Sequence, residues 1–415
     1  MEALQILHII QQLSGGGASR SLIAIAKYSM QFSGFQHRVI SLKTADGTFT
    51  KKAEQCGISV VSAPTDSELF YEISTADVVQ IHFWNNPEIY RLLRSPLPEM
   101  RLLIWFHTAG DHPPQIITRE LIDFSDFALA SSPYSTDLPV FNQLPVSVRK
   151  SKTGMVYGAS DFARLGQCQP KPHSDFNIGY VGALNFAKLH PNYISMSARI
   201  TVPDVHFIVC GDGPNRMHLK RQAHELGAGD RFEFLGYVEN IAPILEQLDV
   251  FGYPLCEDNY STAELVLQEA MYAGIPPIIF PYGGAQRTVI HNQTGLIVHS
   301  EAEYIDAIEY LYYHVEERNR LSQQAQAYAR EFLGAQNSAL QLQQIYKQLI
   351  KEPKRNRCWP THLASSLLVP ADRPFSGALF FIESLGQTAP QFLTSLVSDD
   401  LEALFAADEK IATSS

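Results

Sequence analysis

The stretch NYSTAELVLQEAMYAGIPPIIF, residues 259–280, passes from a helix through a stop into a strand, and so decides the fold class. The segment Leu265–Ala273 has the composition of a helix, and Gly274 followed by Pro276 supplies its end. The apolar run after this stop is typical of a buried strand. Ser261 and Glu264 have the three-residue spacing of a capping box, and we expect them to satisfy amide groups at the start of the helix.

Glu269 is not explained by this local pattern. It lies inside the predicted helix, close to apolar Leu265, Val266, Leu267 and Ala270. Its carboxylate either lies on the solvent face or points into a cleft, where it can accept hydrogen bonds from vicinal hydroxyl groups. The stretch itself leaves both alternatives open.

The alternation of helix and strand extends over most of the chain. The strands expected before residue 150 are LQILHII, HRVISL, ISVVSA, DVVQIHF, RLLIWF and DFALASS. After a linker near Gln167–Ser174, the expected strands are NIGYVGAL, VHFIVCG, RFEFLGYV, DVFGYPL and PPIIFPYG. This order predicts an α/β fold with two Rossmann-like, doubly wound domains. Ligands of such sheets bind at the carboxyl ends of the strands, so two domains facing each other form a cleft.

These patterns also give the expected domain boundaries. Residues 1–165 and 166–330 form the two domains, and residues 331–351 form a closing helix that crosses back to the first domain. Residues 352–415 form a tail that is short for a core of its own. The tail is either the opening of a further domain or a strap on the main body.

Composition narrows the class of protein. With 45% hydrophobic and 18% charged residues, the chain is typical of a globular protein. We expect neither a membrane-spanning helix nor a targeting segment, because no apolar run approaches about 18 residues. A net charge of −11 argues against nucleic acid as a partner. Five scattered cysteines suit the reducing cytoplasm, which is the expected location.

Three groups of candidate residues follow predicted strands. Gly15, Gly16 and Gly17 precede a helix, where glycines let the backbone approach an anionic ligand; a tight turn without a ligand fits equally well. Lys188 follows the strand NIGYV and could meet a phosphate, although a solvated loop lysine is the simpler interpretation. His82 and His107 end two apolar runs, where they are either hydrogen-bonding groups in a cleft or satisfied, half-buried histidines.

Taken together, these segments resemble the retaining GT-B glycosyltransferases of family 4 over residues 1–350. The segments that carry the resemblance are GGGASRSLIAIA, FHTAG, YVGALNFAKLHP, FIVCGDGPNRMHLKRQAHELGAGDRFEFLGYVENI and LQEAMYAGIPPIIFPYGGAQRTVIHNQTGLIV. The resemblance implies a GT-B fold, with the acceptor on the side of residues 1–165 and the nucleotide sugar bound by residues 166–330.

The resemblance also implies a role for each matching position. Glu269 matches the second glutamate of a paired signature, which binds the ribose hydroxyls of the nucleotide. Lys188 matches the basic residue that neutralises the donor diphosphate, and His107 matches a cleft histidine near the transferred sugar. The remaining donor-side positions are Gly15, Gly16, Gly17, Gly211, Glu264, Gly283, Gly284 and Arg287.

Three positions depart from the family pattern. Ser261 stands where the first signature glutamate is expected, with Glu264 nearby. Ala183 replaces an arginine, so one of two expected diphosphate cations is missing. Arg287 replaces a glutamate of the glycine-rich loop and could itself supply a cation.

The function implied by the resemblance is transfer of a hexose from a nucleotide diphosphate sugar to a saccharide or lipid-linked acceptor, with retention of configuration. No Asp-x-Asp pair occurs, so we expect no metal, and no cofactor besides the donor substrate. Two alternatives are a catalytically silent GT-B protein that binds a sugar nucleotide or a partner, and a GT-B sugar-nucleotide epimerase. Peripheral association with the inner face of the membrane stays open, and the oligomeric state is not predicted.

Overall fold

The computed structural model describes residues 3–359 and 377–396 of the 415. The chain divides into two compact units, which we treat separately. Unit 1 combines the residues up to Val156 with those from Ala339 onward, and unit 2 is Tyr157–Ser338. The sequence placed the first boundary at residue 165 and the return helix at residues 331–351. In the structure helix α16 (Ala335–Leu349) begins with the last four residues of unit 2 and continues in unit 1.

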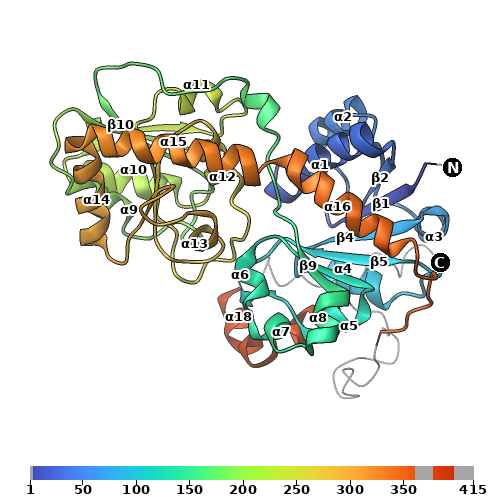
Figure 1. Ribbon diagram of the computed structural model, residues 1–415. Coiled ribbons are helices and arrows are strands. Elements are labelled where there is room, and N and C mark those ends of the chain that lie inside the picture. Colours follow the sequence, from blue (N-terminus) through green and yellow to red (C-terminus); the bar gives the residue numbers. More distant parts are fainter. Residues whose placement is uncertain (1–2, 360–376, 397–415) are drawn as a thin grey trace. The chain divides into compact units, whose positions relative to one another are not determined.

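Unit 1 is built on a seven-stranded parallel sheet in the order β3-β2-β1-β4-β5-β8-β9 (Figure 1). All six strands expected here are confirmed. They are β1 (Gln5–Ile10), β2 (Gln36–Ser41), β3 (Ser59–Ser62), β4 (Val78–Phe83), β5 (Leu102–Phe106) and β8 (Phe127–Ala130). Strand β9 (Thr153–Met155) and the hairpin of β6 (Asp111–His112) and β7 (Gln115–Ile116) were not expected. Strands β4, β5 and β8 are wholly buried, as their continuous apolar runs require.

Helices follow most strands of unit 1, as a doubly wound fold requires. Several start on local sequence signals: Asn86 caps the amide of Ile89, with Pro87 in the first turn, and Thr65 and Glu68 form a capping box. The helices of this unit are α1 (Gly17–Ser33), α2 (Gly47–Gln55), α3 (Asp66–Thr75), α4 (Pro87–Arg94), α5 (Arg119–Phe124), α6 (Pro133–Thr136), α7 (Pro139–Asn142), α8 (Val146–Lys152), α16, α17 (Gly377–Ser384) and α18 (Ala389–Ser395).

Unit 2 repeats the architecture with a six-stranded parallel sheet in the order β12-β11-β10-β13-β14-β15. All five expected strands are confirmed, and β15 (Leu296–Ile297) is additional. The others are β10 (Phe176–Val181), β11 (Val205–Cys210), β12 (Phe232–Gly236), β13 (Val250–Tyr253) and β14 (Pro277–Ile279). The helical segments are η1 (Phe162–Leu165), α9 (Tyr193–Ala198), α10 (Arg216–Glu225), η2 (Gly229–Arg231), α11 (Ala242–Leu245), α12 (Leu265–Tyr272), α13 (Ala285–Thr288), α14 (Glu301–Tyr313) and α15 (Val315–Phe332).

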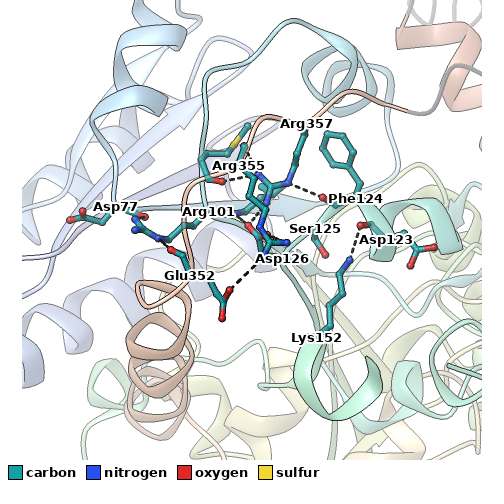
Figure 2. Close-up of polar contacts among 12 residues, drawn as sticks. Asp77, Arg101, Asp123, Phe124, Ser125, Asp126, Lys152, Glu352, Arg355 and Arg357 are labelled. Carbon is teal, nitrogen blue, oxygen red and sulfur yellow. Dashed lines mark hydrogen bonds and ion pairs between the residues drawn. The ribbon is translucent and has the colours of Figure 1, made fainter. Parts of the chain in front are cut away.

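The segment that follows α16 is fixed to the edge of unit 1 by backbone and ionic contacts (Figure 2). Met100 and Arg355 exchange two backbone hydrogen bonds, of 3.2 and 3.1 Å. Arg357 donates to the carbonyl oxygens of Phe124 (2.9 Å) and Met100 (2.7 Å) and pairs with the buried carboxylate of Asp126. The first residues of the predicted tail, 352–359, are therefore part of the folded unit.

The described end of the tail packs into the core of unit 1. Helix α17 lies against α4, so closely that a Cβ on Gly377 would lie 2.0 Å from the carbonyl oxygen of Pro87. Trp359, Phe380 and Phe381 are buried in the same apolar cluster as the residues of β4 and β5. These residues form a strap on unit 1. The parts of the predicted tail at 360–376 and 397–415 lie outside the described residues.

Candidate functional site

The strand order of unit 2 reverses between β10 and β13, which places two loops beside each other. Lys188 follows β10, and Glu264 lies between β13 and α12. Backbone hydrogen bonds hold the loops together, from Cys256 N to Lys188 O (2.8 Å) and from His190 N to Pro254 O (2.9 Å). Such a switch point, at the carboxyl ends of parallel strands, is where ligands bind in open α/β sheets.

Lys188 and Glu264 meet at this switch point in an ion pair, with Nζ 3.0 Å from Oε2. The side chains are 17% and 3% exposed, and the hydroxyl of Tyr253 also donates to the carboxylate. Burial opposes ionisation of Glu264. The charge of Lys188 and the hydrogen bond from Tyr253 outweigh this effect and hold the pKa of Glu264 below its ordinary value. The carboxylate of Glu264 is therefore charged at neutral pH.

The structure corrects the predicted capping box of Ser261 and Glu264. Helix α12 begins only at Leu265, with Glu264 as its N-cap residue in the left-handed region (φ 38°) and without a side-chain capping bond. Tertiary packing outcompetes the local signal, because the preceding loop is held against the turn after β14. Gly284 N donates to Ser261 O at 3.0 Å.

Glu269 lies in the second turn of α12 and is only 2% exposed. The solvent-face alternative is therefore wrong. Its Oε1 atom accepts hydrogen bonds from Ser160 and from Arg164, whose Nε lies 3.1 Å away. Its Oε2 atom is buried and has no hydrogen-bond partner among the described residues. A buried carboxylate oxygen in this state is an acceptor that a hydroxyl group of a ligand can satisfy.

Ser160 and Arg164 were missed by the sequence reasoning. They lie in the segment that enters unit 2, and η1 (Phe162–Leu165) presents the arginine. The ring of Phe162 stacks on Tyr272 of α12, with centroids 4.3 Å apart, and this contact fixes the segment on the helix. No motif marks these residues, since their relation to Glu269 arises only from the fold.

Three glycines of unit 2 have a packing reason for being glycine. A Cβ on Gly211 (φ 141°) would lie 1.8 Å from Gly182 O, and one on Gly284 would lie 1.6 Å from Thr262 O. Gly283 has φ 56°, a conformation that favours glycine. The absence of a side chain at Gly211 lets the loops after β10 and β11 approach each other, and its absence at Gly284 does the same for the loops after β14 and before α12. Their predicted contact with a donor stays a prediction.

The glycine run of unit 1 differs in this respect. Gly15, Gly16 and Gly17 follow β1, next to the point where that sheet reverses between β1 and β4, and all three are exposed. A Cβ on Gly16 would meet no atom within 4 Å. Packing therefore does not require glycine at Gly16. The interpretation that the backbone of this loop approaches a ligand stays a prediction.

Arg287 lies in α13 and is exposed, and its carbonyl oxygen accepts from the hydroxyl of Tyr157 at 3.4 Å. Its predicted role as a second cation stays a prediction.

His107 follows β5 and is buried, with a partner at each ring nitrogen. Its Nε2 lies 2.9 Å from Nδ1 of His82, and its Nδ1 lies 3.4 Å from Oγ of Ser131. Burial lowers the pKa of His107 to about 3, so the ring is neutral at neutral pH. The satisfied-histidine interpretation therefore describes both His82 and His107 in this structure. The proposed contact of His107 with a sugar stays a prediction.

The hydrogen bonds of His82 continue through two more histidines, which the sequence reasoning missed. Nε2 of His82 lies 2.9 Å from Nδ1 of His8, and Nε2 of His8 lies 2.8 Å from Nδ1 of His37. His37 ends the chain on the hydroxyl of Ser29, at 2.9 Å. Burial, and the neighbouring rings for His8 and His82, lower the pKa of these three histidines. The signal in the sequence was a histidine inside each of three apolar strands.

No helix in the described ranges, 3–359 and 377–396, has the length and apolar character needed to cross a membrane.

A family model matches most of unit 2. Residues 164–328 match the model described as Glycosyl transferases group 1. The GDP-mannose-dependent alpha-(1-6)-phosphatidylinositol monomannoside mannosyltransferase of Mycobacterium tuberculosis is 34% identical over 109 residues, covering 25% of this chain and 28% of the relative. The 2-deoxystreptamine N-acetyl-D-glucosaminyltransferase of Streptomyces fradiae is 29% identical over 118 residues, covering 27% of each. These matches span little more than a quarter of the relatives' length.

Solved structures share the fold over most of the chain. A glycosyltransferase of Rickettsia africae superposes with a TM-score of 0.69 at 14% identity, covering 85% of this chain and 100% of the other. HepE of Anabaena, in complex with UDP-glucose, gives a TM-score of 0.66 at 20% identity, covering 83% and 99%. At these identities the likeness shows the fold alone. Residues 164–328 are therefore similar to the glycosyl transferases group 1 family, and the chain has the GT-B fold that these solved structures share.

Proposed function

We propose that the protein is a glycosyltransferase that moves a hexose from a nucleotide diphosphate sugar to a saccharide or lipid-linked acceptor, with retention and without a metal. The family match covers unit 2, which contains both Lys188 and Glu269. The relatives that match this unit are named as transferases of mannose and N-acetyl-D-glucosamine. We keep the cytoplasm as the proposed location, with peripheral membrane contact where the acceptor is lipid-linked.

The observation that carries the proposal is the unsatisfied Oε2 of Glu269. A carboxylate oxygen that is both buried and unpaired is rare in folded proteins and calls for a partner. Arg164 and Ser160 hold Oε1, so the carboxylate is oriented before any ligand arrives. A ribose diol offers the matching donor, and the proposal assigns Glu269 to that diol.

The departing diphosphate requires positive charge. Amides at a helix N-terminus contribute about 0.3–1 kcal/mol, or about 2 kcal/mol when partly buried. Enzymes typically lower the barrier by about 8 kcal/mol or more, so a full cation in a site of low water content is needed. Lys188 at the switch point is our candidate, and Arg287 is the second.

The relatives suggest which donors to test. HepE was solved with UDP-glucose, and the mycobacterial relative is named as dependent on GDP-mannose. A thermal-shift screen against UDP-, GDP- and ADP-sugars should find one class that raises the midpoint of unfolding, because a donor binds only the folded form. Glu269→Gln should lose most of that shift. A screen in which no sugar nucleotide shifts the wild-type midpoint would contradict the proposal.

A second candidate function is a catalytically silent GT-B protein that still binds a sugar nucleotide. It is favoured by the ion pair of Lys188 with Glu264, which neutralises the proposed phosphate cation. Release of free sugar or of product from the bound donor, followed over hours, separates the two: the enzyme turns over the donor, whereas the silent protein returns it unchanged. Conversion of the donor without acceptor into an epimer would identify an epimerase instead.

A further inference from the structure

Glu264, the ion-pair partner of Lys188, is the residue directly before α12 and has an unusual backbone conformation. Glu264 adopts φ 38°, a left-handed conformation that side-chain-bearing residues rarely occupy. In this conformation its carboxylate is buried and reaches Lys188 Nζ at 3.0 Å, and it also accepts from Tyr253. Glu264 therefore places a negative charge at the start of α12, in direct contact with Lys188. Lys188 is the residue that the proposed function requires to bind phosphate.

A carboxylate and a phosphate oxygen make the same kind of bond to a lysine ammonium. We infer that Glu264 holds the place of a donor phosphate oxygen on Lys188, and that the diphosphate must displace it to bind. This inference rests on the proposed function. It identifies Glu264 as the residue that sets the affinity of the site for diphosphate. The glutamate acts as an internal competitor of the donor.

The charge balance explains why such a competitor matters. Ala183 replaces one expected cation, and Glu264 cancels the charge of Lys188, so these three positions together offer no net positive charge. A diphosphate gains full use of Lys188 only after Glu264 has moved away. Removing the negative charge of Glu264 while keeping its shape should therefore tighten the binding of diphosphates.

An opposite role for Glu264 is equally testable. If Glu264 replaced the missing first glutamate at Ser261 and accepted hydrogen bonds from a sugar hydroxyl, loss of its charge would weaken donor binding. The two roles thus predict opposite signs for the same substitution.

The experiment is titration calorimetry of the full chain with inorganic pyrophosphate and with UDP. Glu264→Gln should bind pyrophosphate about tenfold or more tightly than the wild type, since a buried ion pair no longer competes. Lys188→Met should bind it weakly in either background. Glu246→Gln, which breaks the more exposed pair of Lys171 and Glu246 in the same unit (2.5 Å), is the matched control and should bind as the wild type does.

Equal or weaker binding of pyrophosphate by a folded Glu264→Gln variant would overturn the inference while leaving the proposed function intact. If that variant does not fold, Glu264→Asp shortens the carboxylate and should tighten binding in the same direction; unchanged or weaker binding there would also overturn the inference. Failure of the wild type and of every variant to bind pyrophosphate or UDP would also overturn the inference, whereas the proposed function is tested separately by the screen of UDP-, GDP- and ADP-sugars.

Discussion

Nε of Arg164 lies 3.1 Å from Oε1 of Glu269, so a residue of the segment entering unit 2 holds the carboxylate on which the proposed site depends. The side chain of Arg164 is 30% exposed and that of Glu269 is 2% exposed. The ion pair therefore orients the carboxylate of Glu269, while part of the Arg164 side chain stays exposed to solvent.

Arg164→Met should destabilise unit 2 and weaken nucleotide binding, because a buried carboxylate loses its counter-charge. Breaking a buried pair costs several kcal/mol, and we reduce this to about 1–3 kcal/mol for a partly exposed arginine. Urea unfolding followed by circular dichroism measures the change. Arg199→Met, which removes the exposed pair with Glu301, is the control and should change stability by less than about 1 kcal/mol. Equal losses in the two variants would contradict a special role of Arg164.

Lys188→Met should abolish transfer and also destabilise the fold, since Glu264 is left buried without its cation. The double variant Lys188→Met with Glu264→Gln removes both charges and should recover most of the lost stability. It should not recover transfer, because the phosphate cation is still missing. Melting curves and initial rates on the same preparations separate these effects. Restored transfer in the double variant would show that Lys188 has only a structural role.

The four buried histidines predict acid sensitivity of unit 1. Their pKa values are lowered by burial, to about 3 for His37 and His107, whereas an unfolded histidine titrates near 6.5. Between these values the unfolded state binds protons that the folded state does not. The free energy of unfolding is thus highest above about pH 6.5, where histidine is neutral in both states. It falls as the pH is lowered, by about 1.4 kcal/mol per pH unit for each histidine.

This dependence can be measured without interference from carboxylates by urea unfolding between pH 7.5 and 5.5. All three tryptophans, at positions 84, 105 and 359, belong to unit 1, so tryptophan fluorescence reports on this unit. His37→Gln should make the pH dependence shallower, whereas substitution of the exposed His206 by glutamine should leave it unchanged. A free energy of unfolding that is constant over this range would contradict the neutral histidine chain.

Truncation after Lys351 should unfold unit 1 or leave it strongly destabilised. The truncation removes the buried side chains of Trp359, Phe380 and Phe381, each worth about 1.5–3 kcal/mol of burial. It also strips the carboxylate of Asp126 of its partner Arg357. Fluorescence of the remaining tryptophans and protease sensitivity report the outcome. A truncated chain as stable as the full one would show that the strap is dispensable.

The fold was largely predictable because the central strands are rich in apolar residues and alternate with helical segments along the chain. Of the strands that were not predicted, β9 (Thr153–Met155) and β15 (Leu296–Ile297) are short and lie at sheet edges, and the hairpin of β6 and β7 has only two residues in each strand, so that no periodicity can show. The start of α12 at Leu265 was predicted correctly, but the capping box of Ser261 and Glu264 was wrong, because the local signal lost to loop packing around Gly284.

The site was predictable only in part. The sequence placed Lys188 in the loop after the strand NIGYV and Glu269 inside a helix, and the structure has both there, with Lys188 at the switch point of unit 2. Their partners, Glu264 and Arg164, could not be assigned as partners, because each contact joins segments far apart in the sequence. Pairs of this kind arise from the tertiary fold, and no fixed spacing in the sequence marks them.

The proposed function depends above all on one contact, between Oε2 of Glu269 and the ribose diol of a nucleotide. The most direct test compares, by calorimetry, the affinity of the preferred nucleoside diphosphate with that of its 2′,3′-dideoxy analogue, in the wild type and in Glu269→Gln. We predict that loss of the diol weakens binding by about tenfold or more in the wild type and by less than about twofold in the variant. Wild-type protein that binds both nucleotides equally well, or a variant that discriminates as strongly as the wild type, would contradict the account.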